Sequence, residues 1–368
     1  MRRLARWVVL MAVVAGVFLA ARGGRSPAVK SVDFPAGEGP RTEVLVSPQW
    51  VHAAQVYQED SFRGEPPARW GANRLVVVEA AWVPPGKRAA YDRGHVPGAV
   101  LLNTEDLETG YPAWQLRPLA DLQLAIGRVG ITPETTVVVY ARSLLAAARV
   151  WWVLSYAGVK DVRLMDGGWD GWQQAGFPIE TIERPVATVD FAAEPRSRWL
   201  MTTDEMRERV GRSDLCLGDV RSVEEFAGRA SGYSTLEARG RIPGAIHLGD
   251  ADDASPLYRS HDGRLRQPQD VLSLWQRQGL NVQDQGNPLT KEIVFYCGGG
   301  WRSSLAFFYA WLLGVETPRN YSGGWVEWST AYHPDPQAGG STPGWRQSAT
   351  GHPVVASPQA TTAPSPAR

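Results

Sequence analysis

The stretch YAGVKDVRLMDGGWDGW, residues 156–172, is matched later in the chain by LLGVETPRNYSGGWVEW, residues 312–328. In both stretches a glycine lies nine residues before a Gly-Gly-Trp triplet. Similarity at a fixed offset of this kind is the signature of a repeated structural unit. The sequence therefore indicates one domain that is used twice.

Three further pairs of segments match in the same order along the chain. They are GHVPGAV (94–100) with GRIPGAI (240–246), strand-like LVVVEAAW (75–82) with LCLGDVRS (215–222), and TVVVYA (136–141) with EIVFYC (292–297). We therefore expect a first copy over residues 44–185 and a second over 200–335, joined by a linker over 186–199.

Within each copy, short apolar runs alternate with amphipathic stretches of helix length. Thr202 and Glu205 have the spacing of a capping box, and Ser47-Pro48 suits a helix start. Strands that alternate with helices predict an α/β fold, here two tandem domains, each a small parallel sheet covered by helices on both faces. In such sheets reactive groups collect at the carboxyl ends of the strands.

The two ends of the chain differ in composition from the repeats. A basic start, MRRLAR, precedes an apolar run of about 15 residues, which is typical of a secretory signal and shorter than the ~20 residues of a spanning helix. We predict a signal peptide or N-terminal anchor over residues 1–25, and hence an exported, periplasmic protein, or one attached to the membrane. Residues 338–368, rich in Gly, Ser, Thr, Pro and Ala, predict a disordered tail.

The chain has two cysteines, and one of them lies in FYCGGGWRSS, residues 295–304. Cys216 lies in a strand-like run and is expected to be a buried small hydrophobic residue. Cys297, by contrast, ends a strand and precedes three glycines, Arg302 and a helix expected from about Ser303. Inward-pointing backbone N–H groups, a helix N-terminus and a cation all favour a thiolate. The loop therefore predicts a reactive cysteine beside a pocket for a negatively charged partner.

Together, CGGGWRSS, GRIPGAI, DVRS and SGGWVEW resemble the rhodanese sulfurtransferases of the tandem-domain, thiosulfate/3-mercaptopyruvate type, exported in bacteria, over about residues 44–335. The resemblance implies five-stranded parallel sheets and a nucleophile carried by the C-terminal copy. An ungapped alignment of the two copies places Ala141 opposite Cys297 and Ala146 opposite Arg302. The first copy is therefore expected to be catalytically inactive and to form a wall of the cleft.

The resemblance implies transfer of a sulfane sulfur from thiosulfate or a thiosulfonate to a thiol or cyanide through a Cys297 persulfide, without a metal or organic cofactor. The binding loop would comprise Gly298, Gly299, Gly300, Trp301, Arg302 and Ser303. The alternative is a persulfide carrier with little turnover. Phosphatase or arsenate reductase activity is disfavoured, because four residues separate Cys297 from Arg302, one fewer than in similar cysteine phosphatases. Equal numbers of basic and acidic residues, 38 each, give no reason to expect a nucleic-acid partner.

Five positions bear further on the site. Asp219 and Arg221 match a family motif that orients the active loop, or form an ion pair that fixes a turn. Trp301 is expected to line the entrance for the donor. The thiosulfate-preferring animal enzymes carry two cations for the donor, and the corresponding residues here are Gly299 and Glu225. A carboxylate at that place would repel a dianion, which disfavours thiosulfate as the natural donor.

Overall fold

The computed structural model describes residues 41–60, 65–68, 70–71, 73–84, 88–249, 255–280, 292–315, 318–335 and 344–355. All of them belong to one compact unit, Ala36–Arg368. The signal peptide or anchor expected over residues 1–25 lies outside the described residues. Among the helices that the structure does describe, none is both long enough and apolar enough to cross a bilayer.

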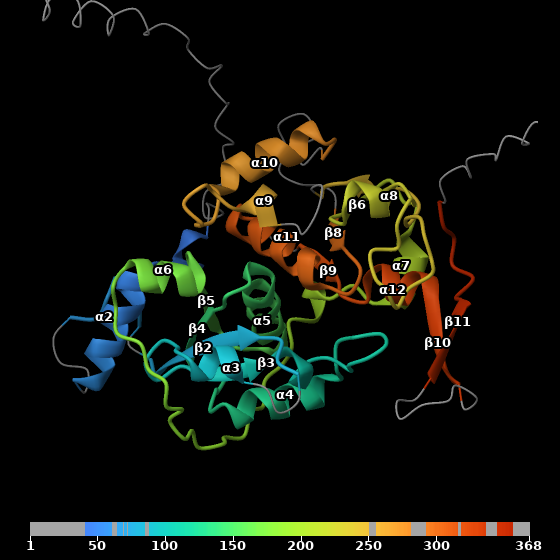
Figure 1. The fold of residues 1–368 in the computed structure, drawn as a ribbon. Helices are drawn as coiled ribbons and strands as arrows, with labels where there is room; N and C mark the ends of the chain where they lie inside the picture. Colours follow the sequence, from blue (N-terminus) through green and yellow to red (C-terminus); the bar gives the residue numbers. More distant parts are fainter. Residues whose placement is uncertain are drawn as a thin grey trace, which may run out of the picture. The chain divides into compact units, whose positions relative to one another are not determined.

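The first copy forms one parallel sheet with its helices (Figure 1). Its elements are η1 (Thr42–Val44), β1 (Leu45–Val46), α2 (Pro48–Glu59), β2 (Leu75–Ala81), α3 (Ala89–Asp92), β3 (Val100–Asn103), η2 (Thr104–Asp106), α4 (Leu119–Arg128), β4 (Thr136–Tyr140), α5 (Leu144–Ala157), β5 (Asp161–Met165) and α6 (Gly168–Gln174). The five strands lie in the order β1-β5-β4-β2-β3, and every neighbouring pair is parallel.

The second copy repeats this arrangement. Its elements are η3 (Ser197–Trp199), α7 (Thr203–Arg209), β6 (Leu215–Asp219), α8 (Val223–Phe226), β7 (Ile246–His247), α9 (Ser255–Tyr258), α10 (Pro268–Arg277), β8 (Glu292–Tyr296), α11 (Trp301–Leu312), β9 (Arg319–Tyr321) and α12 (Gly324–Ser329). Its parallel sheet has the order β7-β6-β8-β9. The α/β prediction with two tandem domains is therefore confirmed.

The second sheet has four strands in the described residues, where the resemblance implied five. A single parallel bridge between Leu200 and Asn320 of β9 lies where β1 pairs with β5 in the first copy. Thr202 already caps α7, so the chain leaves the sheet edge after one bridge. The fifth strand is thus reduced to one residue pair.

Side-chain alternation explains why both faces of each sheet are covered. In β2 and β4, Val77 and Val138 pack on one face with Val51 of α2, while α5 contacts the opposite face. In β8, Val294 packs in the same core cluster as the α12 side chains, on one face of the sheet. Phe295 points to the opposite face, where the centroid of its ring lies 5.3 Å from that of Trp275 in α10. Strands covered on both faces read as continuous apolar runs, as seen here.

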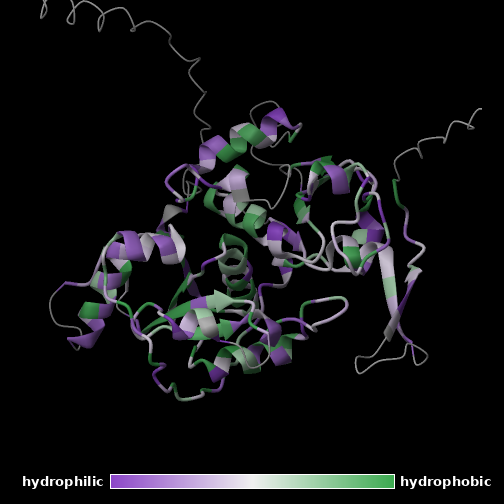
Figure 2. Cartoon of the chain, viewed as in Figure 1, coloured by the Kyte–Doolittle hydropathy of each residue, from purple (hydrophilic) through white to green (hydrophobic). Residues whose placement is uncertain are grey.

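The helix starts that the sequence predicted are present. Thr202 Oγ1 accepts a hydrogen bond from the Glu205 N–H (3.2 Å), and Glu205 Oε2 accepts one from the Thr202 N–H (3.0 Å), which is a complete capping box. Ser47 Oγ accepts from the Trp50 N–H at 3.1 Å. In Figure 2, α10 shows hydrophilic and hydrophobic segments along its length, as expected for a helix with one buried face.

The repeated Gly-Gly-Trp triplet has the same structural role in both copies. Gly324 has φ +56°, and a Cβ atom there would lie 2.4 Å from the Cys297 carbonyl oxygen. In the first copy Gly168 has φ +53°, and a Cβ atom would lie 2.5 Å from the carbonyl oxygen of Ala141. Only glycine fits such a left-handed close approach. The triplet therefore brings a helix N-terminus against the end of the neighbouring strand in each domain.

The two copies pack against each other through α5 and α11 (Figure 1). The Trp151 ring of α5 meets the Phe308 ring of α11 edge-on, with centroids 4.7 Å apart. Asp166 at the end of β5 accepts a hydrogen bond from the Leu265 N–H of the second copy at 2.8 Å. The helix that follows the active cysteine is thus supported by its counterpart in the first copy.

Part of the stretch expected as a disordered tail is ordered. Strand β11 (Gly344–Ala349) pairs antiparallel with β10 (Thr330–Asp335), and Val355 forms a bridge with Arg241. Low apolar content misled the interpretation, because β10 and β11 form a separate two-stranded sheet whose backbone hydrogen bonds need few apolar residues. The expectation of a tail from residue 338 onward is therefore wrong for residues 344–355.

Candidate active site

Cys297 follows β8 directly and lies at the carboxyl end of the second sheet, as expected. The residue is 1% exposed. Its Sγ accepts hydrogen bonds from the Gly300 N–H at 3.2 Å and from the Ser303 hydroxyl at 3.6 Å. Helix α11 begins at Trp301, two residues earlier than predicted, so the loop is shorter than the sequence suggested. The sulfur therefore lies in a tight turn at a helix N-terminus.

The three loop glycines differ in how strictly the structure requires a glycine. Gly300 has φ +94°, and a Cβ atom there would lie 2.6 Å from a terminal nitrogen of Arg149. Gly298 lacks a positive φ, but a Cβ atom would lie 2.1 Å from the Tyr233 ring. Gly299 has neither constraint, since the atom nearest to an added Cβ would be the Trp114 carbonyl oxygen at 3.9 Å. Only one of the three supplies left-handed backbone.

Helix α12 fixes the carbonyl groups of the loop. The Trp325 N–H donates to the Cys297 carbonyl at 2.7 Å, and the Val326 N–H donates to the Gly298 carbonyl at 3.0 Å. These bonds occupy the carbonyl oxygens on the side away from the thiol. The N–H groups that follow Cys297 are thereby left for the sulfur.

Arg302 and Glu225 form a two-pronged ion pair beside the thiol. The guanidinium nitrogens donate to the two Glu225 oxygens at 2.6 and 2.8 Å, and one of them also donates to the Tyr233 hydroxyl at 3.3 Å. Glu225 is held in place by a second capping box, with Ser222. The carboxylate that the sequence placed near the pocket is therefore present, and it neutralises Arg302.

The environment of Cys297 favours the thiolate overall. Burial raises the pKa of the thiol, but the Arg302 charge and hydrogen bonds from Ser303 and Gly299 outweigh burial and lower that pKa below its usual value. For Tyr233, burial is the main effect and raises the pKa to about 12, so its hydroxyl stays protonated at neutral pH. The site thus combines a thiol of lowered pKa with a hydroxyl donor.

Asp219 and Arg221 are fully buried and paired, with one bond of 2.6 Å between them. The Tyr296 hydroxyl donates to Asp219 at 2.6 Å, and Arg221 donates to the Gly240 carbonyl at 2.8 Å. Tyr296 directly precedes Cys297, so the pair acts on the end of strand β8. No hydrogen bond joins the pair to loop residues 298–303 within the described structure.

The first copy contributes a buried ion pair to the back of the loop. Arg149 of α5 donates from Nε to Glu108 at 3.0 Å and from a terminal nitrogen to Ser322 Oγ at 3.0 Å. Glu108 also accepts from the Trp301 indole N–H at 2.8 Å. Burial raises the pKa of Glu108, whereas the Arg149 charge and the Trp301 hydrogen bond act in the opposite direction. Two residues of the first copy thus hold a residue of the loop that follows Cys297.

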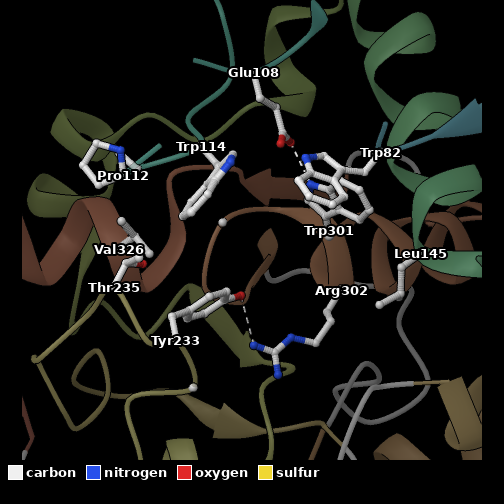
Figure 3. Close-up of a pocket in the computed structure, with 13 residues that line it drawn as sticks. Trp82, Glu108, Pro112, Trp114, Leu145, Tyr233, Thr235, Trp301, Arg302 and Val326 are labelled. Atoms are coloured by element: carbon white, nitrogen blue, oxygen red, sulfur yellow. Dashed lines mark hydrogen bonds between the residues drawn. The ribbon is translucent and has the colours of Figure 1, made fainter. Parts of the chain in front are cut away.

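A cavity of about 480 Å³ opens beside the loop (Figure 3). Residues of both copies line it, so the first copy forms one wall, as expected. Figure 3 shows Trp114 on one side, Trp82 and Trp301 on the other, and Tyr233 below them. Trp301 lines the cavity, as the sequence suggested. Four of the residues that line the cavity are aromatic.

Sequence reasoning missed Glu108, Arg149, Tyr233, Trp82 and Trp114. The hydrogen bond between Trp301 and Glu108 spans 193 positions of the chain, and no motif connects the two residues. The one available signal was an arginine inside the apolar helix sequence LLAAARVWW, where a charge needs a buried partner. As for a metal, no cluster of three or more His, Cys, Asp or Glu side chains able to hold one occurs in the described ranges.

Two α/β domains with a cysteine loop at the end of the second sheet define the class of protein. The rhodanese-like domain family matches residues 83–175 and 202–331. The chain is similar to the thiosulfate sulfurtransferase YnjE of Escherichia coli (strain K12), with 36% identity over 297 residues that cover 79% of this chain and 64% of that relative. A putative thiosulfate sulfurtransferase of Haloferax volcanii is 31% identical over 292 residues, covering 78% and 93% of the two chains.

Solved structures agree with the sequence comparisons. The crystal structure of YnjE superimposes with a TM-score of 0.69 at 34% identity, covering 78% of this chain and 67% of that one. An EanB variant that carries a cysteine persulfide, solved with ergothioneine, gives 0.69 at 32% identity and covers 80% and 70%. Curated relatives are named thiosulfate or 3-mercaptopyruvate sulfurtransferases. The chain belongs to the rhodanese family of tandem-domain sulfurtransferases.

Proposed function

We propose that this protein moves a sulfane sulfur from a donor to an acceptor through a persulfide on Cys297. The observation that carries the proposal is the buried thiol, whose pKa is lowered and whose Sγ accepts hydrogen bonds from Gly300 and Ser303. Covalent catalysis of this kind requires an activated thiolate and a pocket that stabilises the intermediate. A structural neighbour with a cysteine persulfide supports the same chemistry.

In the first half-reaction, the Cys297 thiolate attacks the outer sulfur of a donor such as thiosulfate. A new S–S bond forms to Sγ, the S–S bond of the donor breaks, and its electron pair leaves with sulfite. In the second half-reaction, a thiol or cyanide attacks the outer sulfur of the persulfide, and the electron pair of the S–S bond returns to Sγ. The N–H group of Gly300 and the Ser303 hydroxyl would stabilise the charged sulfur in both directions.

The charge of the site favours a donor with one negative charge over a dianion. Glu225 occupies both terminal nitrogens of Arg302. A thiosulfate dianion would have to compete with that carboxylate for the cation. We therefore favour a thiosulfonate-type donor, with thiosulfate as a weaker one.

We also propose export, because the basic and apolar N-terminal segment is typical of a secretory signal. Expression of the full-length chain in a bacterial host, followed by fractionation, should place it in the periplasm or on the membrane. Recovery of the uncleaved chain in the soluble cytoplasmic fraction would contradict this proposal.

Turnover distinguishes an enzyme from a persulfide carrier. Incubation with a thiosulfonate and cyanide should form many equivalents of thiocyanate per protein chain. A carrier would form a single equivalent, limited by the sulfur it already holds. Release of phosphate from a phenyl phosphate ester, without thiocyanate formation, would overturn sulfur transfer altogether.

A further inference from the structure

Glu108 places an unsatisfied carboxylate oxygen in the cavity beside Cys297. The side chain is 3% exposed, and Glu108 belongs to the cavity lining. Its hydrogen bonds from Arg149 and Trp301 both end on Oε1. Within the described part of the chain, no donor reaches Oε2. Oε2 is not one of the fully buried polar atoms that lack a partner, so water or a ligand in the cavity can reach it.

The other groups that line the cavity favour the same kind of ligand. The faces of Trp82, Trp114, Trp301 and Tyr233 surround the space, and aromatic faces are electron-rich (Figure 3). Such walls bind ammonium and quaternary ammonium groups through cation–π attraction. An anion gains nothing from them.

Arg302 and Glu108, the two charged residues that line the cavity, differ in whether they keep an atom free for a ligand. Both terminal nitrogens of Arg302 are bound by Glu225. Glu108 shares one oxygen between its two partners and keeps the other. Of the two charged residues in the lining, only Glu108 therefore leaves an atom free to meet a ligand, and Arg149 balances its charge from behind.

We propose that the cavity binds a sulfur acceptor that carries an organic cation, with an ammonium or quaternary ammonium head group between the tryptophans and beside Glu108. This inference rests on the proposed function, since it names the acceptor of the second half-reaction. The nucleophilic atom of the acceptor attacks the outer sulfur of the persulfide, the S–S electron pair returns to Cys297, and the proton of the acceptor passes to solvent.

Three thiols with different head groups test the proposal. The persulfide is formed on the whole protein, excess donor is removed, and discharge is followed by mass with thiocholine, with its neutral isostere in which carbon replaces nitrogen, and with mercaptoethanesulfonate. Each rate is divided by the rate of the same thiol with glutathione persulfide, which corrects for intrinsic reactivity. At sub-saturating concentrations thiocholine should react about tenfold faster than the isostere, and the sulfonate slowest of the three.

Variants locate the effect. Glu108→Gln keeps an acceptor for Arg149 and Trp301 but removes the charge, and should abolish most of the preference for thiocholine. Because that variant leaves Arg149 buried without a counter-charge, Trp114→Leu provides a second test and should reduce the preference severalfold. Trp345→Leu, on strand β11 and outside the cavity, is the matched tryptophan control and should keep the preference.

Binding of choline and of its neutral isostere to the unreacted protein, measured by calorimetry, separates the two hypotheses. Selective choline binding without any persulfide formation would overturn the proposed function and retain the cation site. Normal discharge by cyanide, with equal rates for the three corrected thiols and no preference for choline, would overturn the cation site and retain sulfur transfer.

Discussion

At the scale of single residues, Arg302 has two neighbours with opposite effects on the chemistry. Its charge lowers the pKa of the Cys297 thiol, and its two terminal guanidinium nitrogens are hydrogen-bonded to the Glu225 carboxylate. The side chain of Arg302 is 13% exposed, so solvent screens these interactions little. In the proposed mechanism, Arg302 thus activates the nucleophile, while Glu225 limits how strongly Arg302 can bind an anionic donor.

We predict that Arg302→Ala raises the pH at which Cys297 reacts with iodoacetamide. The wild-type thiol has a lowered pKa and is ionised to a lower pH, so loss of the cation moves the midpoint of alkylation upward. Charge-assisted hydrogen bonds contribute ~1.5–3 kcal/mol, so turnover with a thiosulfonate should fall about ten- to a hundredfold. An unchanged alkylation profile would show that Arg302 only holds the loop.

Glu225→Gln is the matched variant. It keeps the shape of the side chain and leaves the Arg302 charge without its counter-charge. The alkylation midpoint should stay low, and the KM for thiosulfate should decrease relative to wild type. A KM that rises with Glu225→Gln would mean that the carboxylate does not limit binding of the dianion.

At the scale of elements, one glycine in the strand–loop–helix unit around Cys297 is the position that tolerates a side chain least. Gly300 combines φ +94° with the close approach of Arg149, whereas Gly299 has neither constraint. The two positions are neighbours in sequence, so the loop provides its own control.

We predict that Gly300→Ala destabilises the protein by about 1–2 kcal/mol or more, because a left-handed alanine is strained and its Cβ would clash with Arg149. Loss of the Gly300 conformation also removes the N–H bond to Sγ, so activity should fall strongly. Gly299→Ala should change the free energy of unfolding little. Urea unfolding and thiocyanate formation check both variants, and equal effects at the two positions would contradict this account of the loop.

Local features of this unit are what the sequence predicts well. The strand before Cys297, the loop, Arg302 and the capping box of Thr202 are all encoded within a few residues. The sequence places the start of α11 two residues late, because it assigns Trp301 and Arg302 to the loop. In the structure only Gly300 is the helix N-cap, and Trp301 already belongs to the helix.

At the scale of the whole molecule, the first copy supports the second through Arg149 and Glu108. Arg149 is fully buried and joins Glu108 of its own copy to Ser322 of the other. Sequence analysis expected a wall from this copy and did not predict the ion pair. Such partners lie far apart in the chain, and only the packing of α5 on α11 brings them together.

We predict that Arg149→Met destabilises the protein by about 3–5 kcal/mol, because it leaves a buried carboxylate without its partner. The double variant Arg149→Met/Glu108→Gln should be less destabilised than the sum of the single variants. Urea unfolding of the four proteins gives the coupling, and additive effects would show that the pair contributes nothing as a unit.

Persulfide mapping tests the central claim, that Cys297 carries the sulfur, most directly. Wild-type protein and the variants Cys297→Ser and Cys216→Ser are treated with a thiosulfonate, the thiols are blocked, and the peptides are analysed by mass spectrometry. The account predicts one added sulfur atom on the Cys297 peptide of the wild type and of Cys216→Ser, and none in Cys297→Ser. Added sulfur on the Cys216 peptide with Cys297 unmodified, or sulfur transfer that survives Cys297→Ser, would contradict it.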